Sequence, residues 1–69
     1  MKISARNRLK GKVVDVTLGA TTAHVRIDIG GSIITASITN EAVAELGLAA
    51  GKDAYAVVKA SDVMVAVDD

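Results

Sequence analysis

A strict alternation of apolar and polar residues over residues 22–29 constrains the fold of this chain more than any other feature. The odd-numbered positions are apolar and the even-numbered positions are polar. This period of two is typical of a β-strand with one buried face and one solvated face. Gly30 and Gly31 follow directly and predict a tight reversal. A second strand over residues 32–38 is therefore expected to pair with the first as a hairpin.

The remaining sequence predicts three more strands and one short helix. Residues 9–18 form the first strand, in which Gly11 marks a bulge or sharp bend. The helix is Asn40–Leu46, with Thr39 or Asn40 as its N-terminal cap and Gly47 at its end. The other segments are an extended arm, a turn, a late strand, a loop and a final strand: residues 3–6, 19–21, 54–59, 60–62 and 63–67.

Five strands with a helix between the third and the fourth predict an all-β fold, a five-stranded OB-like Greek-key barrel. Residues 1–69 contain no linker and predict a single domain. A domain of this size buries only about 60% of its unfolded surface, so its core is marginal. The chain has no cysteine and one histidine, although it is 51% hydrophobic. Oligomerisation is therefore expected to supply the missing stability.

The charges balance over the whole chain but not along it. Eight basic residues match eight acidic ones, so no overall field favours nucleic acid or an anionic membrane. Five basic residues nevertheless precede the first acidic residue, Asp15: Lys2, Arg6, Arg8, Lys10 and Lys12. No apolar run is long enough to span a membrane, and no signal-peptide core follows Met1. These features predict a cytoplasmic protein with no membrane partner.

Catalysis and nucleic-acid binding are both weakly supported. His24 has no catalytic partner at a recognisable spacing, and Asp15 and Asp28 are expected on a solvated strand face. Tyr55 is the sole aromatic residue, whereas single-strand binders combine a basic groove with several stacking platforms. The chain is therefore predicted to be no enzyme and to have no nucleic-acid partner and no catalytic cofactor.

Small hydroxyls and basic side chains gather at the predicted strand ends. Arginine offers a fork of donors, lysine a point charge, and hydroxyls and backbone amides complete a shell around a compact oxyanion. In an equally supported alternative, Thr39 is only a helix cap, and Arg6 and Lys59 only keep an edge soluble. The residues of this set are Ser4, Arg6, Thr39, Lys59 and Ser61.

Four segments resemble the molbindin, or Mop, family of small cytoplasmic molybdate-binding proteins. They are residues 1–11, 45–48, 51–52 and 58–64, which occur in the family's order, and the resemblance extends over the whole chain. The resemblance implies an OB-like barrel that assembles as a hexamer, a trimer of dimers with exchanged N-terminal strands. It also implies that molybdate, and usually tungstate, is bound at subunit interfaces as a ligand for intracellular storage or homeostasis, with no bare metal cation.

The family's binding residues carry over position by position. Ser4 and Thr39 would supply hydroxyls, Arg6 and Lys59 would neutralise the dianion, and Ala5 and Ala60 would offer backbone amides, with Ser61 beside them. Relatives place a serine where this chain has Ala42, which leaves the site one hydroxyl short. A second oxyanion site of the family, formed by turn backbone, corresponds to Gly19, Ala20, Thr21 and Thr22.

Two other functions stay open on the sequence alone. The first is an OB-type nucleic-acid-binding module, which would be retained on single strands in a salt-sensitive way. The second is a purely structural assembly module, which would form a stable oligomer that is indifferent to every oxyanion.

Overall fold

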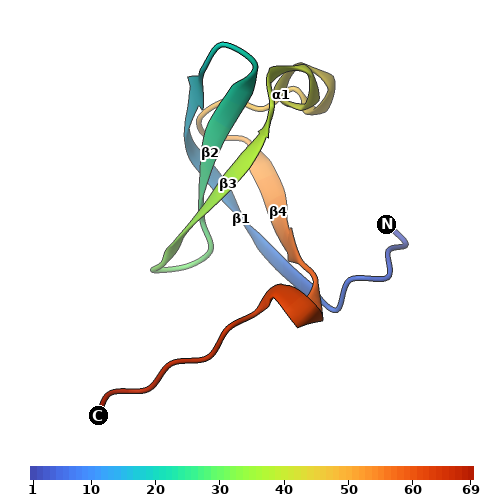
Figure 1. The fold of residues 1–69 in the computed structure, drawn as a ribbon. Helices are drawn as coiled ribbons and strands as arrows, with labels where there is room; N and C mark the ends of the chain where they lie inside the picture. The colour runs from blue at the N-terminus through green and yellow to red at the C-terminus, as the bar shows by residue number, and fades with distance from the viewer.

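The computed structural model describes residues 1–69 as one twisted antiparallel sheet with a short helix at one end (Figure 1). The predicted strands and helix between residues 7 and 58 are confirmed, with boundaries that differ by at most two residues. The elements are β1 (Asn7–Leu18), β2 (Thr22–Asp28), β3 (Ile33–Thr39), α1 (Asn40–Leu46), β4 (Asp53–Val58) and the 3-10 helix η1 (Ala60–Asp62). No helix is long and apolar enough to cross a membrane.

The sheet has four strands in the order β3-β2-β1-β4 and forms half of a barrel. The prediction of a five-stranded barrel is therefore wrong for the single chain, although the all-β class is confirmed. Residues 63–67 are extended and exposed but pair with no strand. Residues 60–62 form η1 where a loop was expected, and the chain then leads away from the sheet (Figure 1). Because β-structure needs a neighbouring strand, the apolar pattern of this tail is not enough to make it a fifth strand.

Gly11 has a different role from the one predicted. The register between β1 and β2 shifts between Val13 and Asp15, so the bulge lies at Val14 and not at Gly11. A Cβ atom at position 11 would collide with the backbone carbonyl oxygen of Asp28. Glycine is therefore required here because two backbones approach closely, and not because β1 bulges at this position.

The two predicted turns are confirmed. Gly30 and Gly31 both have positive φ, which glycine adopts without steric cost. One carboxylate oxygen of Asp28 accepts from both glycine N–H groups, at 2.9 and 3.1 Å. The Gly19 N–H donates to the Thr22 carbonyl at 2.9 Å and closes the turn between β1 and β2.

Helix α1 is closed at both ends by the residues that its sequence predicts. The Thr39 hydroxyl accepts from the Ala42 N–H at 3.0 Å, while Gly47 adopts the left-handed conformation at the C-terminus. The Lys52 ammonium also donates to the Leu46 carbonyl at 2.6 Å. These caps stabilise a helix of seven residues, a segment that is too short to be helical on its own.

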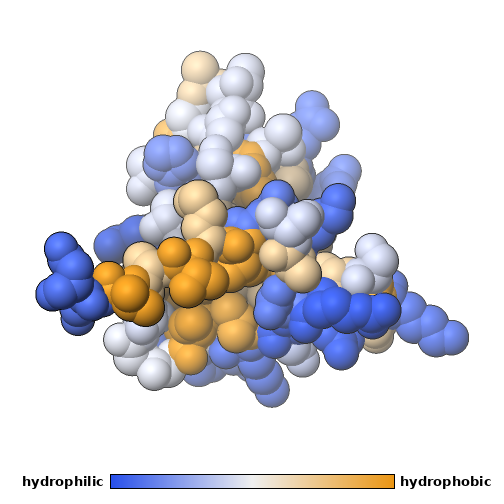
Figure 2. Space-filling view, turned by 60° about the horizontal axis from the view of Figure 1, so that its bottom comes forward, coloured by the Kyte–Doolittle hydropathy of each residue, from blue (hydrophilic) through white to orange (hydrophobic).

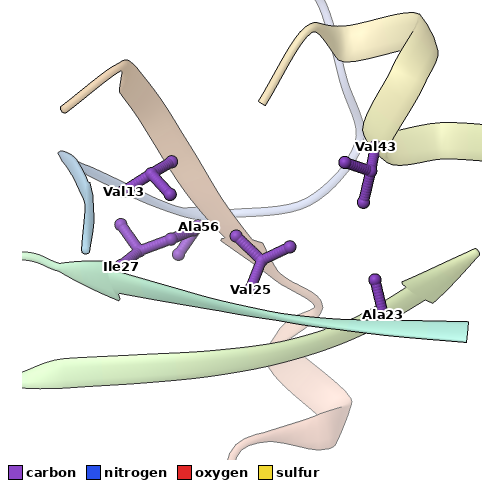
Figure 3. Close-up of a cluster of buried hydrophobic side chains, with 6 residues drawn as sticks. All are labelled: Val13, Ala23, Val25, Ile27, Val43 and Ala56. Atoms are coloured by element: carbon purple, nitrogen blue, oxygen red, sulfur yellow. The ribbon is translucent and has the colours of Figure 1, made fainter. Parts of the chain in front are cut away.

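The buried core is small and lies between the sheet and α1. Six residues are buried, and all six are aliphatic or alanine (Figure 3): Val13, Ala23, Val25, Ile27, Val43 and Ala56. The alternation in β2 places three of them on its inner face. Many larger apolar side chains remain exposed, so the isolated chain buries little of its apolar content.

Candidate oxyanion site

The start of β1 and the end of β4 bring two of the predicted site segments together. Asn7, the first residue of β1, is paired with Val58, the last residue of β4. The Asn7 amide also donates to the Val58 carbonyl at 3.2 Å, which ties the two strand ends together. Arg6 and Lys59 are the next residues on either side of this pair. We call this end of the sheet, with Ser4, Ala5, Arg6, Lys59, Ala60 and Ser61, the arm end.

The arm end presents hydrogen-bond donors that no group of the chain uses. In η1, the Asp62 and Val63 N–H groups donate to the carbonyls of Lys59 and Ala60. The N–H groups of Ala60 and Ser61 have no such acceptor, as is normal for the first residues of a helical turn. The Ala5 N–H is unused as well, and the side chains of Ser4 and Ser61 are exposed.

Two cations stand beside these donors without a counter-ion. The ion pairs of the chain are Lys12 with Asp53 and Arg26 with Asp15, so Arg6 and Lys59 take part in neither. Both side chains are exposed. Two positive charges, two hydroxyls and several free N–H groups form a donor set that suits a compact dianion.

Thr39 is placed at the other end of the sheet, away from the rest of the predicted site. It ends β3 opposite Thr22 and next to α1, and we call this region the helix end. β1 has twelve residues and joins the two ends, and a straight strand of that length spans about 35 Å. A single chain therefore does not bring Thr39 to Arg6 and Lys59. Ala42 lies at the helix end as well, half-buried in the first turn of α1.

The second predicted site lies at the helix end, beside Thr39. The Thr21 carbonyl accepts from the Asn40 N–H at 2.9 Å, and the Gly19 carbonyl accepts from the Asn40 amide at 3.0 Å. The N–H groups of Ala20 and Thr21 donate to no group of the chain. This turn thus offers two adjacent backbone donors to an anion, but the predicted second site contains no basic side chain that would neutralise the anion's charge. The Asn40 Oδ1 atom is buried there without a partner.

The carboxyl groups considered for acid–base catalysis are held in their charged form. Arg26 donates to Asp15 at 3.1 Å and 2.5 Å, and these hydrogen bonds lower the pKa of that carboxyl. The N–H groups of Gly30 and Gly31 lower the pKa of Asp28 in the same way. A general acid needs the opposite shift. No cluster of three metal-ligating side chains is present.

His24 is exposed on β2 between Thr17 of β1 and Ser37 of β3. Ser37 is not recognisable from the sequence as a neighbour of His24, because only the pairing of β2 with β3 brings the two residues together. No hydrogen bond joins these side chains, and no carboxylate orients the imidazole through one. The arrangement therefore lacks the third group that a catalytic serine–histidine pair needs.

The features expected of a nucleic-acid site are sparse. Tyr55 is half-exposed on β4, and Lys10 lies opposite it on β1. One ring beside one lysine gives a single stacking position, whereas binding of a single strand uses several along a basic groove.

Comparison with known protein families supports an oxyanion site over these alternatives. The TOBE domain family model matches residues 3–65. A probable molybdenum-pterin-binding protein of Haemophilus influenzae is 54% identical over 69 residues, which cover 99% of this chain and 100% of that protein.

Solved structures show the same fold. A molybdate-binding protein from Sporomusa ovata superposes with a TM-score of 0.92 at 37% identity and covers 97% of this chain and 100% of its own. The cytoplasmic molybdate-binding protein ModG, solved with molybdate bound, superposes with a TM-score of 0.88 at 48% identity. That match covers 93% of this chain but only 46% of ModG.

Proposed function

The chain belongs to the TOBE-domain family, and we propose that it binds molybdate, and tungstate with it, at interfaces between copies of itself. The observation that carries this proposal is the arm end, where Arg6 and Lys59 lack counter-ions beside unused N–H groups. Molybdate as the ligand is supported by the two molybdate-binding proteins of similar fold and by the probable molybdenum-pterin-binding protein of similar sequence.

A dianion needs this combination of groups. Taking a doubly charged anion out of water is costly unless opposite charges and hydrogen bonds replace its hydration. Arg6 and Lys59 supply two positive charges, and Ser4, Ser61 and the Ala60 N–H supply neutral donors. The assigned residues offer donors and no side-chain acceptor other than hydroxyl oxygens. Molybdate is fully deprotonated near neutral pH, whereas phosphate keeps a proton that needs an acceptor, so the set favours molybdate.

The position of Thr39 supports a shared site. Thr39 belongs to the predicted ligand set but lies at the opposite end of the sheet from Arg6 and Lys59. The complete set can therefore form only when the arm end of one copy meets the helix end of another. The Thr39 hydroxyl accepts from Ala42 and still has its own hydrogen to donate to an oxyanion.

The apolar surface supports assembly through exchanged strands. A groove of about 560 Å³ runs between the free edges of β3 and β4, and its lining is mostly apolar. The tail, residues 63–69, is extended, and its Met64 and Val65 are 94% and 88% exposed. Figure 2 shows apolar side chains gathered in a band across one face of the molecule. We propose that the tail of a second copy, residues 63–69, fills this groove and so forms a dimer by exchange. Three such dimers would then form a hexamer.

The proposed physiological role is storage and homeostasis of molybdenum in the cytoplasm, by a single Mop-type domain over residues 1–69. The ligand is held and released without chemical change, so no catalytic cofactor is required. The turn of Gly19 to Thr22, with its two free N–H groups, is the proposed second oxyanion site.

Calorimetric titration of the assembled protein with molybdate, tungstate, sulfate and phosphate tests the proposal, with native mass recorded in parallel. We expect saturable binding of molybdate and tungstate, weak binding of the other two anions, and the mass of a hexamer. Val65→Asp places a charge in the apolar tail and should reduce both assembly and binding. A protein that assembles but ignores molybdate would contradict the function, and a compact monomer that binds molybdate would contradict the interface site.

A further inference from the structure

We propose that Arg8 and Lys10 form a positively charged path that steers oxyanions toward the arm end without binding them. The inference rests on the proposed function, since it assumes that molybdate is captured beside Arg6 and Lys59. It assigns a kinetic role to two side chains outside the predicted ligand set.

The register of β1 and β4 places these cations on one exposed face. Arg8 lies opposite Val57 and Lys10 lies opposite Tyr55. Residues two apart on a strand share a face, so Arg8 and Lys10 point to the same side of the sheet. Val57 and Tyr55 cannot neutralise them, and neither cation takes part in an ion pair.

Lys12 marks the end of this path. It continues the same alternation, but its partner across the sheet is Asp53, and its ammonium contacts that carboxylate at 2.7 Å. The pair is electrically neutral, so the free positive charge begins at Lys10 and increases toward Arg6. At the arm end, Asp62 is the acidic residue that follows Lys59, against three cations: Arg6, Arg8 and Lys59. Lys10 lies farther along β1, and the Asp53 carboxylate, whose pKa is lowered first by its hydrogen bond from Lys12, also interacts with the Lys10 charge. The chain is neutral overall, so this concentration is local.

Spacing along the strand separates steering from binding. Two residues of strand advance the chain by about 7 Å, so Arg8 lies about 7 Å and Lys10 about 13 Å along the chain from Arg6. Fields at these distances still act across water, because the Debye length is about 30 Å at 0.01 M salt and about 8 Å at 0.15 M. We therefore expect both residues to act at low salt, and Arg8 to act more than Lys10 at physiological salt.

Rapid filtration of radiolabelled molybdate on the assembled protein measures the association rate, and a chase with unlabelled molybdate measures dissociation. For Arg8→Gln/Lys10→Gln we expect association to slow about three- to tenfold at low salt, since local fields raise association rates by at least that factor. The dissociation rate should change less than twofold. The difference in association should vanish near 1 M salt, where the Debye length is about 3 Å.

Two control variants isolate the charge. Arg8→Lys/Lys10→Arg keeps both charges and should keep the wild-type association rate. Lys12→Gln/Asp53→Asn removes a neutral pair from the same face and should also leave it unchanged. Native mass spectrometry checks that each variant assembles as the wild type does. If the double variant does not assemble, the single Lys10→Gln variant is measured in its place. Equal association rates in all assembled variants, or a loss that appears only in dissociation, would overturn the steering role while leaving the binding function intact. Absence of molybdate binding by the wild type would overturn both.

Discussion

The helix end and the arm end of the sheet differ in how many of their hydrogen bonds the chain supplies itself, although the helix end also leaves the Ala20 and Thr21 N–H groups and the Asn40 Oδ1 atom without partners. At the helix end, Thr39 caps α1, and Asn40 donates from both its backbone and its side chain to the turn between β1 and β2. At the arm end, two cations have no counter-ion, and the first N–H groups of η1 have no acceptor. Both ends belong to one sheet, and β1 extends from one end to the other.

The contrast separates the parts of the molecule that fold alone from the parts that need a partner. The helix end holds Ala23 and Val43 of the core, and its hydrogen bonds stabilise it within one chain. The arm end has exposed apolar residues in its tail and unpaired charge beside them. Under the proposed function, an anion and a second chain would supply what this region lacks. Substitutions at the arm end should therefore change molybdate binding more than folding stability. Substitutions at the helix end should lower folding stability, and those of Thr39 should change binding as well.

Arg6→Ala gives the largest expected effect on binding. Removal of one of the two positive charges leaves part of the negative charge of the desolvated dianion without a counter-charge. Affinity for molybdate should therefore fall about 100-fold or more, equivalent to about 2.7 kcal/mol. Lys59→Ala should behave similarly. The thermal midpoint of the ligand-free protein should hardly change, because Arg6 is exposed and makes no ion pair. Calorimetry and a thermal melt measure the two quantities.

Two control variants match this prediction in residue type and in charge. Arg26→Ala removes an arginine whose charge is already used by Asp15, and Asp69→Ala alters the exposed chain end. Neither should weaken molybdate binding appreciably. If all these variants lose affinity alike, the assignment of the site to the arm end is wrong.

Substitutions of Thr39 separate its structural role from its proposed binding role. Thr39→Ala removes the cap and should cost about 1 kcal/mol of folding stability. Thr39→Asp keeps a good cap but brings a carboxylate toward the dianion. It should therefore retain the wild-type thermal midpoint while binding of molybdate is lost. Thermal melts and calorimetry of the assembled variants test both effects.

Thr39→Ser is the matched control, because it keeps both the cap and the hydroxyl. We expect its stability and affinity to stay close to those of the wild type. Normal molybdate binding by Thr39→Asp would mean that Thr39 is only a cap, and the helix end would then have no part in the first site.

The sequence predicts the central sheet well because its signals are local. Period-two alternation fixes β2, paired glycines fix the reversal after it, and Thr39 and Gly47 bound the helix. Each of these depends on neighbours a few residues away. The meeting of the arm-end segments was expected only from the resemblance to the molbindin family, because the pairing that brings them together joins Asn7 to Val58, which are far apart in the sequence.

The errors concern relations that are not local. Residues 63–67 carry the apolar alternation of a strand, but a strand needs an edge to pair with, and their own chain leads them away from both free edges. Gly11 indicates a special backbone position, but only the approach of Asp28 shows that the position is a close contact. The place of Thr39 in the site stays a prediction, because register puts it at the other end of β1 from Arg6 and Lys59 within one chain.

The smallest expected effect concerns the hairpin tip formed by Asp28, Gly30 and Gly31, which projects from the sheet at the opposite end of β2 from Thr22 and is closed by its own side chain. The two glycine N–H groups lower the pKa of Asp28 below its ordinary value of 3.8, so the unfolded chain takes up this proton first as the solution is acidified. The stability that the carboxylate contributes is therefore present above pH 3.8 and is lost as the pH falls through the folded pKa. Asp28→Asn keeps an acceptor for the glycine N–H groups but no charge, so its thermal midpoint should decline less steeply on acidification than that of the wild type. If Asp28→Asn loses stability on acidification as steeply as the wild type does, the charge of Asp28 does not stabilise the hairpin tip.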